Sequence, residues 1–108
     1  MKLIVAMIRP ETLLAVQEAL SDTEGRLMSA GEVSDLRRPQ ANVYRGSQYR
    51  VSRVRLRLEI VVRNESLVDG VVEAIARGAG GEDIFVMNLD DYRATPARAG
   101  AVGRTIAV

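Results

Sequence analysis

The sequence predicts an α+β domain whose elements follow the order strand, helix, strand, strand, helix, strand. Two segments with apolar residues at helical spacing each follow a β-rich run, and one long segment alternates apolar and charged residues. With 108 residues and 47% hydrophobic content, the chain suits a single domain over residues 1–108. This order predicts one antiparallel sheet with both helices on one face, the ferredoxin-like βαββαβ sandwich.

The first strand and the first helix are expected within the first twenty or so residues. Residues 2–8 (KLIVAMI) are apolar and partly β-branched, which predicts a strand buried on both faces. The proline after this run suits the first turn of a helix. Over residues 11–20, Leu13, Val16 and Leu20 recur at spacings of three and four, so we expect an amphipathic helix there.

Two strands around a long loop are expected in the middle of the chain. Residues 26–36 (RLMSAGEVSDL) indicate the second strand, although its pattern is weak. Residues 37–52 are rich in arginine and polar residues and predict the loop. Residues 54–62 then alternate apolar and charged side chains, which places one face of the third strand on the core.

A second helix and a last strand complete the order. Residues 66–77 begin with a pattern that resembles a capping box, formed by Ser66 and Asp69, and continue with one apolar stripe. Gly78 is expected to cap this helix. Residues 83–89 (DIFVMNL) predict the last strand. The tail over residues 91–108 is small, basic and interrupted by proline, and the uncovered face of the sheet predicts a homo-oligomer.

The composition excludes several kinds of chemistry. The chain has no cysteine and no histidine, so thiolate nucleophiles, histidine-dependent triads and soft-metal sites are absent, and no metal site is expected. The other polar residues form no recognisable triad or carboxylate pair, so we do not expect an enzyme. No apolar run reaches the length of about 18 residues that spans a membrane, which predicts a cytoplasmic protein.

Arginine dominates the loop and the strand that follows it. Between Arg37 and Arg63 there are eight arginines and one carboxylate, although the net charge of the chain is only +1. Guanidinium groups suit an oxyanion ligand or an acidic partner, and a solvated strand face would have the same composition. A nucleic-acid-binding module is an alternative, but its usual strong basic excess is missing, so no nucleic acid partner is expected.

Four segments of the chain, in order, resemble the PII signal-transduction family. They are MKLIVAMIRPETLLAVQEAL at the start, YRGSQY, RLRLEIVV and DIFVMNLDD, and the most specific is YRG-x-x-Y followed by the arginine-rich strand. The resemblance covers about residues 1–92. It implies a homotrimer that controls a partner protein through the loop, in nitrogen or inorganic-carbon metabolism. Such a partner would be a membrane transporter or a carboxysome component.

The resemblance also implies an adenine nucleotide in the cleft between subunits. The matching positions hold Ser29, Arg38, Arg55, Glu59 and Val61, with Gly80 and Gly81 as a shortened phosphate-binding turn. Asp83 stands where the family has a phosphate-binding lysine. We therefore expect ADP or AMP to bind better than ATP with magnesium, and bicarbonate is a further candidate ligand.

The hexapeptide YRGSQY (residues 44–49) holds two of the three tyrosines and is predicted to form an exposed loop tip. On the loop, the resemblance assigns contact with the partner or modification to Gln40, Tyr44, Arg45 and Tyr49. Tyr49 matches a tyrosine that is uridylylated in some members of the family. Stacking of the tyrosines on the arginines of the loop would equally explain their presence.

Overall fold

The structure of the chain, a computed structural model, describes residues 1–37, 42–44, 47–49 and 53–96. The elements in chain order are β1 (Lys2–Ile8), the 3-10 turn η1 (Pro10–Thr12), α1 (Leu13–Leu20), β2 (Arg26–Ser34), β3 (Asn42–Tyr44), β4 (Ser47–Tyr49), β5 (Val54–Val62), η2 (Glu65–Leu67), α2 (Val68–Ala79) and β6 (Asp83–Asn88). The predicted order of the long strands and helices is confirmed.

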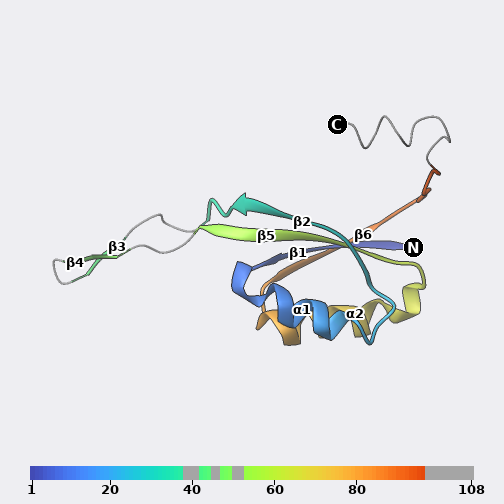
Figure 1. The fold of residues 1–108 in the computed structure, drawn as a ribbon, viewed down its shortest axis with the longest axis horizontal. Helices are drawn as coiled ribbons and strands as arrows, with labels where there is room; N and C mark the ends of the chain where they lie inside the picture. Colours follow the sequence, from blue (N-terminus) through green and yellow to red (C-terminus); the bar gives the residue numbers. More distant parts are fainter. Residues whose placement is uncertain (38–41, 45–46, 50–52, 97–108) are drawn as a thin grey trace.

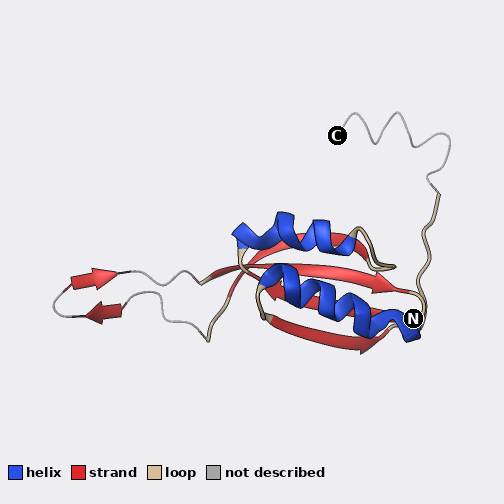
Figure 2. Ribbon diagram, turned by 90° about the horizontal axis from the view of Figure 1, so that it is seen from below, coloured by secondary structure: helices blue, strands red, loops and turns tan. Residues whose placement is uncertain are grey.

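Four strands form one antiparallel sheet in the order β2-β5-β1-β6. The two central strands pair along the whole of β1, from Lys2 opposite Val62 to Ile8 opposite Leu56. Both helices lie against one face of this sheet (Figures 1 and 2). The predicted ferredoxin-like α+β arrangement is therefore confirmed.

The hydrophobic core fills the layer between the sheet and the helices. Ile4 and Ile60, which lie opposite each other in the register, are fully buried there, together with Val16 of α1 and Ile75 of α2. The period-two alternation of β5 places Leu56, Leu58, Ile60 and Val62 in this layer, whereas Val54 at the start of the strand is exposed. In β1 the consecutive residues Ile4–Ala6 are all buried, as the unbroken apolar run predicts.

The other face of the sheet carries apolar side chains that no helix of the described chain covers (Figure 1). Phe85 is 54% exposed, and Met87 on the same strand is also exposed. They lie opposite Val5 and Leu3 of β1 in the register. An uncovered sheet face is therefore present, as the element order predicts.

β2 contains one irregularity that bears on the site. Arg26 lies opposite Val61 of β5, and Ser29 lies opposite Glu59, so three steps along β2 match two steps along β5. The register shift falls between Leu27 and Ser29, which is a β-bulge that contains Met28. The bulge allows Arg26 and Ser29 to lie on the same side of the sheet despite their odd spacing.

The second helix differs from its prediction at both ends. Gly78 lies inside α2, and the cap is Gly80, whose φ of 80° is left-handed. A Cβ atom at Gly78 would lie 2.9 Å from the carbonyl oxygen of Ala15, so this glycine lets α1 and α2 approach closely. At the start, the side chain of Asn64 accepts a hydrogen bond of 3.0 Å from the backbone N–H of Ser66, in place of the predicted capping box.

Other bounds shift by small amounts. The predicted first helix begins as η1 and becomes α-helical only at Leu13, and β2 ends at Ser34 because the chain turns at Asp35. Across the described residues, no helix is long and apolar enough to cross a membrane.

The predicted loop at residues 37–52 contains a short hairpin, which was not predicted from the sequence. β3 and β4 pair with each other, with Asn42 opposite Tyr49 and Tyr44 opposite Ser47, and they form a separate two-stranded sheet. In Figure 1 this hairpin lies beyond the ends of β2 and β5. The hexapeptide YRGSQY thus begins on β3 and ends on β4. Of the other predicted loop residues, Arg38, Gln40 and Arg45 lie outside the described residues.

Candidate functional site

Three of the predicted nucleotide contacts lie together on β2 and β5. The Oγ atom of Ser29 donates a hydrogen bond of 2.6 Å to Oε1 of Glu59, which lies opposite it in the register. Val61 follows two residues later on β5 and therefore shares the face of the sheet with Glu59. The structure thus brings a hydroxyl, a carboxylate and an apolar side chain together on the face that the helices leave uncovered.

Glu59 has two side-chain donors. The hydroxyl of Ser29 has the largest effect and lowers the pKa of Glu59, and Arg57 acts in the same direction through a contact of 3.2 Å to Oε2. Desolvation acts in the opposite direction but is smaller than the effect of the two hydrogen bonds, so the pKa of Glu59 lies below its ordinary value. Glu59 is therefore ionised at neutral pH and presents acceptor oxygens to a ligand.

Arg55, another predicted contact, is placed differently. It is only 6% exposed, and its Nη1 atom donates a hydrogen bond of 2.9 Å to the backbone carbonyl of Val54. Its guanidinium therefore lies below the surface near the end of the loop. A ligand would reach this charge less easily than it would reach the exposed arginines.

The base of the loop is a network of charged groups. Nε and Nη2 of Arg37 each donate to the carboxylate of Asp35 at 3.0 Å, and the backbone N–H of Arg37 donates to it at the same distance. Asp35 is only 5% exposed, and its own N–H donates to the carbonyl of Arg53 at 2.8 Å. Because Arg53 follows the loop, Asp35 joins the two ends of the loop.

Arg37 also contacts Asp83, the first residue of β6. The two carboxylates raise the pKa of Arg37, chiefly through their hydrogen bonds, with that of Asp35 the stronger. Asp83, which the resemblance in the sequence matches to a lysine of the family, is thus paired with a cation of its own chain. The electrostatic effect of Asp83 on a bound phosphate therefore depends on Arg37.

The predicted phosphate-binding turn serves as a helix cap. Gly80 and Gly81 have φ values of 80° and 93°, and their N–H groups donate to the carbonyl oxygen of Ala76 at 2.8 and 3.2 Å. A phosphate at this turn would compete with that carbonyl for both amides.

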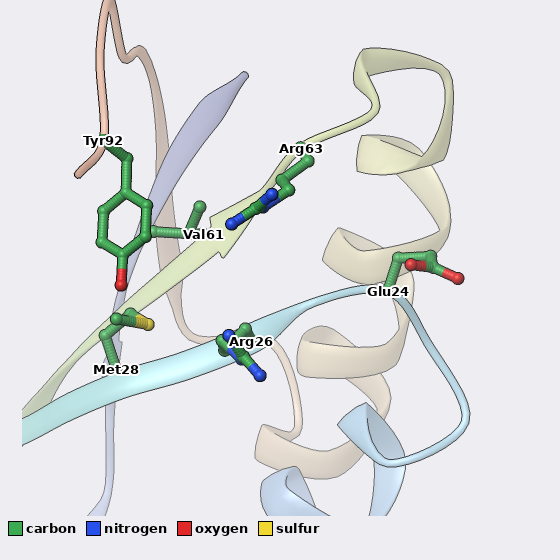
Figure 3. Close-up of a pocket in the computed structure, with 6 residues that line it drawn as sticks. All are labelled: Glu24, Arg26, Met28, Val61, Arg63 and Tyr92. Atoms are coloured by element: carbon green, nitrogen blue, oxygen red, sulfur yellow. The ribbon is translucent and has the colours of Figure 1, made fainter. Parts of the chain in front are cut away.

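A pocket of about 300 Å³ adjoins Val61 on the uncovered face (Figure 3). It is lined by Glu24, Arg26, Met28, Val61, Arg63 and Tyr92. Of these six residues, only Val61 is a binding residue predicted from the sequence. No pattern in the sequence links the others, because they come from the turn before β2, from the start of β2, from the residue after β5 and from the segment after β6.

These features define a small ferredoxin-like domain with a loop hairpin beyond its sheet and a polar cluster on its uncovered face. No protein-family model matches the chain. Individual relatives do match. Nitrogen regulatory protein P-II of Rhizobium etli is 39% identical, with 83% of this chain and 87% of the relative covered.

Two further relatives agree with this match. Nitrogen regulatory protein GlnK1 of Methanosarcina mazei is 34% identical, with 84% of this chain and 86% of the relative covered. Nitrogen regulatory protein P-II of Haemophilus influenzae is 39% identical over 93% of this chain and 94% of its own length. The chain belongs to the nitrogen regulatory protein P-II family, which confirms the resemblance in its sequence.

Proposed function

We propose that the chain is a PII-type signal-transduction regulator that senses an adenine nucleotide, preferably ADP or AMP, and controls a partner protein through the loop at residues 37–52. Its relatives are named nitrogen regulatory proteins, which supports a regulatory rather than an enzymatic role and favours nitrogen metabolism over inorganic carbon. The observation that carries the proposal is the cluster of Ser29, Glu59 and Val61 on one face.

The cluster has the chemistry that an adenine ring requires. The exocyclic amino group of adenine is a donor, and the carboxylate of Glu59 is an acceptor beside it. Ser29 orients that carboxylate through the hydrogen bond of 2.6 Å, and the side chain of Val61 supplies an apolar surface for the ring. A few polar groups beside an apolar wall are typical of small-molecule sites.

The preference for few phosphates rests on the base of the loop. Asp83 is 45% exposed, and the amides of Gly80 and Gly81 already donate to Ala76. A third phosphate near this cluster would meet a carboxylate where the family has a lysine. We expect a preference of roughly tenfold for ADP or AMP over ATP with magnesium.

We also propose that the chain assembles as a homotrimer. Members of this family are typically trimeric, and the uncovered face with Phe85 and Met87 offers an apolar surface for subunit contact. The nucleotide would then bind in the cleft between subunits. The regulated partner would be a target protein such as a membrane transporter, and bicarbonate stays a candidate second ligand.

Calorimetry tests the proposed ligand. The purified chain is titrated with ATP, ADP, AMP, cyclic AMP and bicarbonate, each with and without magnesium. We expect ADP or AMP to bind tightest, Glu59→Gln and Ser29→Ala to weaken binding, and Asp83→Lys to improve the affinity for ATP. Arg77→Gln, an exposed change on α2, is the matched control and should leave binding unchanged.

Two results would contradict the proposal in different ways. If ATP with magnesium binds tightest, the interpretation of Asp83 is wrong. If none of the nucleotides binds, the site has been lost and the chain retains only the fold of its family.

A further inference from the structure

The pocket beside Val61 combines two arginines with an aromatic ring. Arg26 is the first residue of β2 and lies opposite Val61 in the register, and Arg63 directly follows β5. In Figure 3 the guanidinium of Arg63 points toward Val61, Arg26 lies on the neighbouring strand, and the ring of Tyr92 stands on the other side of Val61. Three separate segments therefore converge on one cavity of about 300 Å³.

The positive charge of this pocket is not neutralised within the described chain. Neither the side chain of Arg26 nor that of Arg63 forms an ion pair or hydrogen bond with a residue in the described ranges. Four other arginines do have carboxylate partners, namely Arg9, Arg37, Arg57 and Arg93. Glu24 also lines the pocket, but Figure 3 shows its carboxylate turned away from both arginines.

The remaining walls of the pocket are apolar. Val61 is buried, Met28 in the β-bulge is exposed, and Tyr92 contributes its aromatic ring. Two guanidinium groups suit the oxygens of a phosphate or carboxylate, because their planar donors match such groups. The apolar walls suit a flat ring attached to that oxyanion.

We propose that this pocket binds a small aromatic oxyanion, with its phosphate or carboxylate between Arg26 and Arg63 and its ring against Tyr92 and Val61. The pocket is separate from the proposed adenine contacts, because Ser29 and Glu59 do not line it. Only Val61 is common to both. The chain would therefore hold a second ligand site on the same face of the sheet.

The test uses three probes on the full chain: phenyl phosphate, benzoate and inorganic phosphate. Binding is followed by NMR, through the backbone amides of Arg26 and Arg63 and the ring signals of Tyr92. We expect saturable shifts at these positions with phenyl phosphate or benzoate, and weaker binding of inorganic phosphate, which lacks a ring. The tighter of the two aromatic probes identifies the ligand as a phosphate or a carboxylate.

Variants assign the interaction to named groups. Arg26→Gln and Arg63→Gln should each lower the affinity for the tighter-binding aromatic probe by about tenfold. Tyr92→Leu should lower the affinity for the aromatic probes but leave the affinity for inorganic phosphate unchanged. Arg77→Gln, on α2 and away from the pocket, is the control and should bind all probes as the parent chain does. Because Arg26, Arg63 and Arg77 are exposed, we expect all three variants to fold, which circular dichroism verifies.

Failure of this proposal is distinguishable from failure of the proposed function. Ser29→Ala and Glu59→Gln should lose affinity for adenine nucleotides and keep affinity for the aromatic probes. The pocket proposal is overturned if the probes give no saturable shift at Arg26, Arg63 and Tyr92. It is equally overturned if both arginine variants bind the aromatic probes as tightly as the parent chain.

Discussion

Arg37 and Asp83 are in contact, although 46 positions separate them in the chain. The contact joins the beginning of the loop to the first residue of β6. Arg37 holds Asp35 with the same guanidinium, so one cation serves two carboxylates. The two partners differ in burial, since Asp35 is buried and Asp83 is partly exposed to solvent.

This difference predicts unequal effects of two substitutions. Arg37→Gln should lower the stability more than Asp83→Asn, because it removes a guanidinium that donates two hydrogen bonds to the buried carboxylate of Asp35. Water can replace Arg37 at Asp83. The urea midpoints of the two variants provide the comparison, and adding Asp35→Asn to Arg37→Gln should recover part of the loss. Equal midpoints for the two single variants would show that the burial of Asp35 has no energetic role.

Two glycines of α2 predict opposite effects when each is replaced by alanine. A Cβ atom at Gly78 would lie within 3.0 Å of backbone atoms of Ala15 and Val16, so α1 would have to move, at a cost of about 1–3 kcal/mol. A Cβ atom at Gly70 would meet no atom within 4 Å, and alanine should stabilise the helix there by about 0.5–1 kcal/mol. Chemical unfolding of both variants measures the change in the free energy of unfolding, which should decrease in Gly78→Ala and increase in Gly70→Ala. A neutral Gly78→Ala would refute the close approach of the helices.

The hydrogen bond from Ser29 predicts a pH dependence at Glu59. Ser29→Ala removes the largest cause of the lowered pKa of Glu59, so this pKa should rise toward its ordinary value. In the parent chain the pKa is lower in the folded state than in the unfolded state. The interaction therefore adds stability above the unfolded pKa and loses it as the pH falls through the folded pKa. Carbon NMR titration of the Glu59 carboxyl in both proteins checks the shift, and an unchanged pKa in Ser29→Ala would contradict the assignment.

The proposed homotrimer predicts that a charge on the uncovered face will block assembly. Phe85→Glu places a carboxylate on an apolar surface that would be buried between subunits, and it should yield monomers. Leu14→Glu is the control, because Leu14 is also exposed but lies on α1, on the opposite side of the sheet. Size-exclusion chromatography with light scattering gives the molar mass of each variant in solution and thus the number of subunits. A monomeric parent chain at micromolar concentration would argue against the trimer itself.

Much of the fold is predictable because hydrophobic periodicity is a local signal. The bounds of β5 agree with the predicted 54–62, since alternation over nine residues is hard to mistake. Gly78 was interpreted wrongly as a cap because the reason for a glycine there is the neighbouring helix, which no local pattern reveals. The three-residue strands β3 and β4 are too short for a period to be recognised.

The candidate site is predictable only in part. The family resemblance pointed to Ser29, Glu59 and Val61, and the register of β2 and β5 brings them together. The pocket with Arg26 and Tyr92 depends on the bulge and on the path of the chain after β6. Both are tertiary features, so the arginine-rich composition indicated an anion partner without indicating which arginines are available.

The bulge at Met28 interrupts the regular alternation of side-chain direction along β2. In a regular strand, positions 26 and 29 would point to opposite sides, and one of the two side chains would enter the hydrophobic layer. The extra residue resets the alternation, so a guanidinium and a hydroxyl share one surface within a single strand. Deleting Met28 would restore the regular pleat and leave Arg26 and Ser29 two positions apart, so both would stay on the same surface and only the exposed side chain of Met28 would be lost. The bulge therefore adds one exposed side chain to β2 while Arg26 and Ser29 keep a common surface.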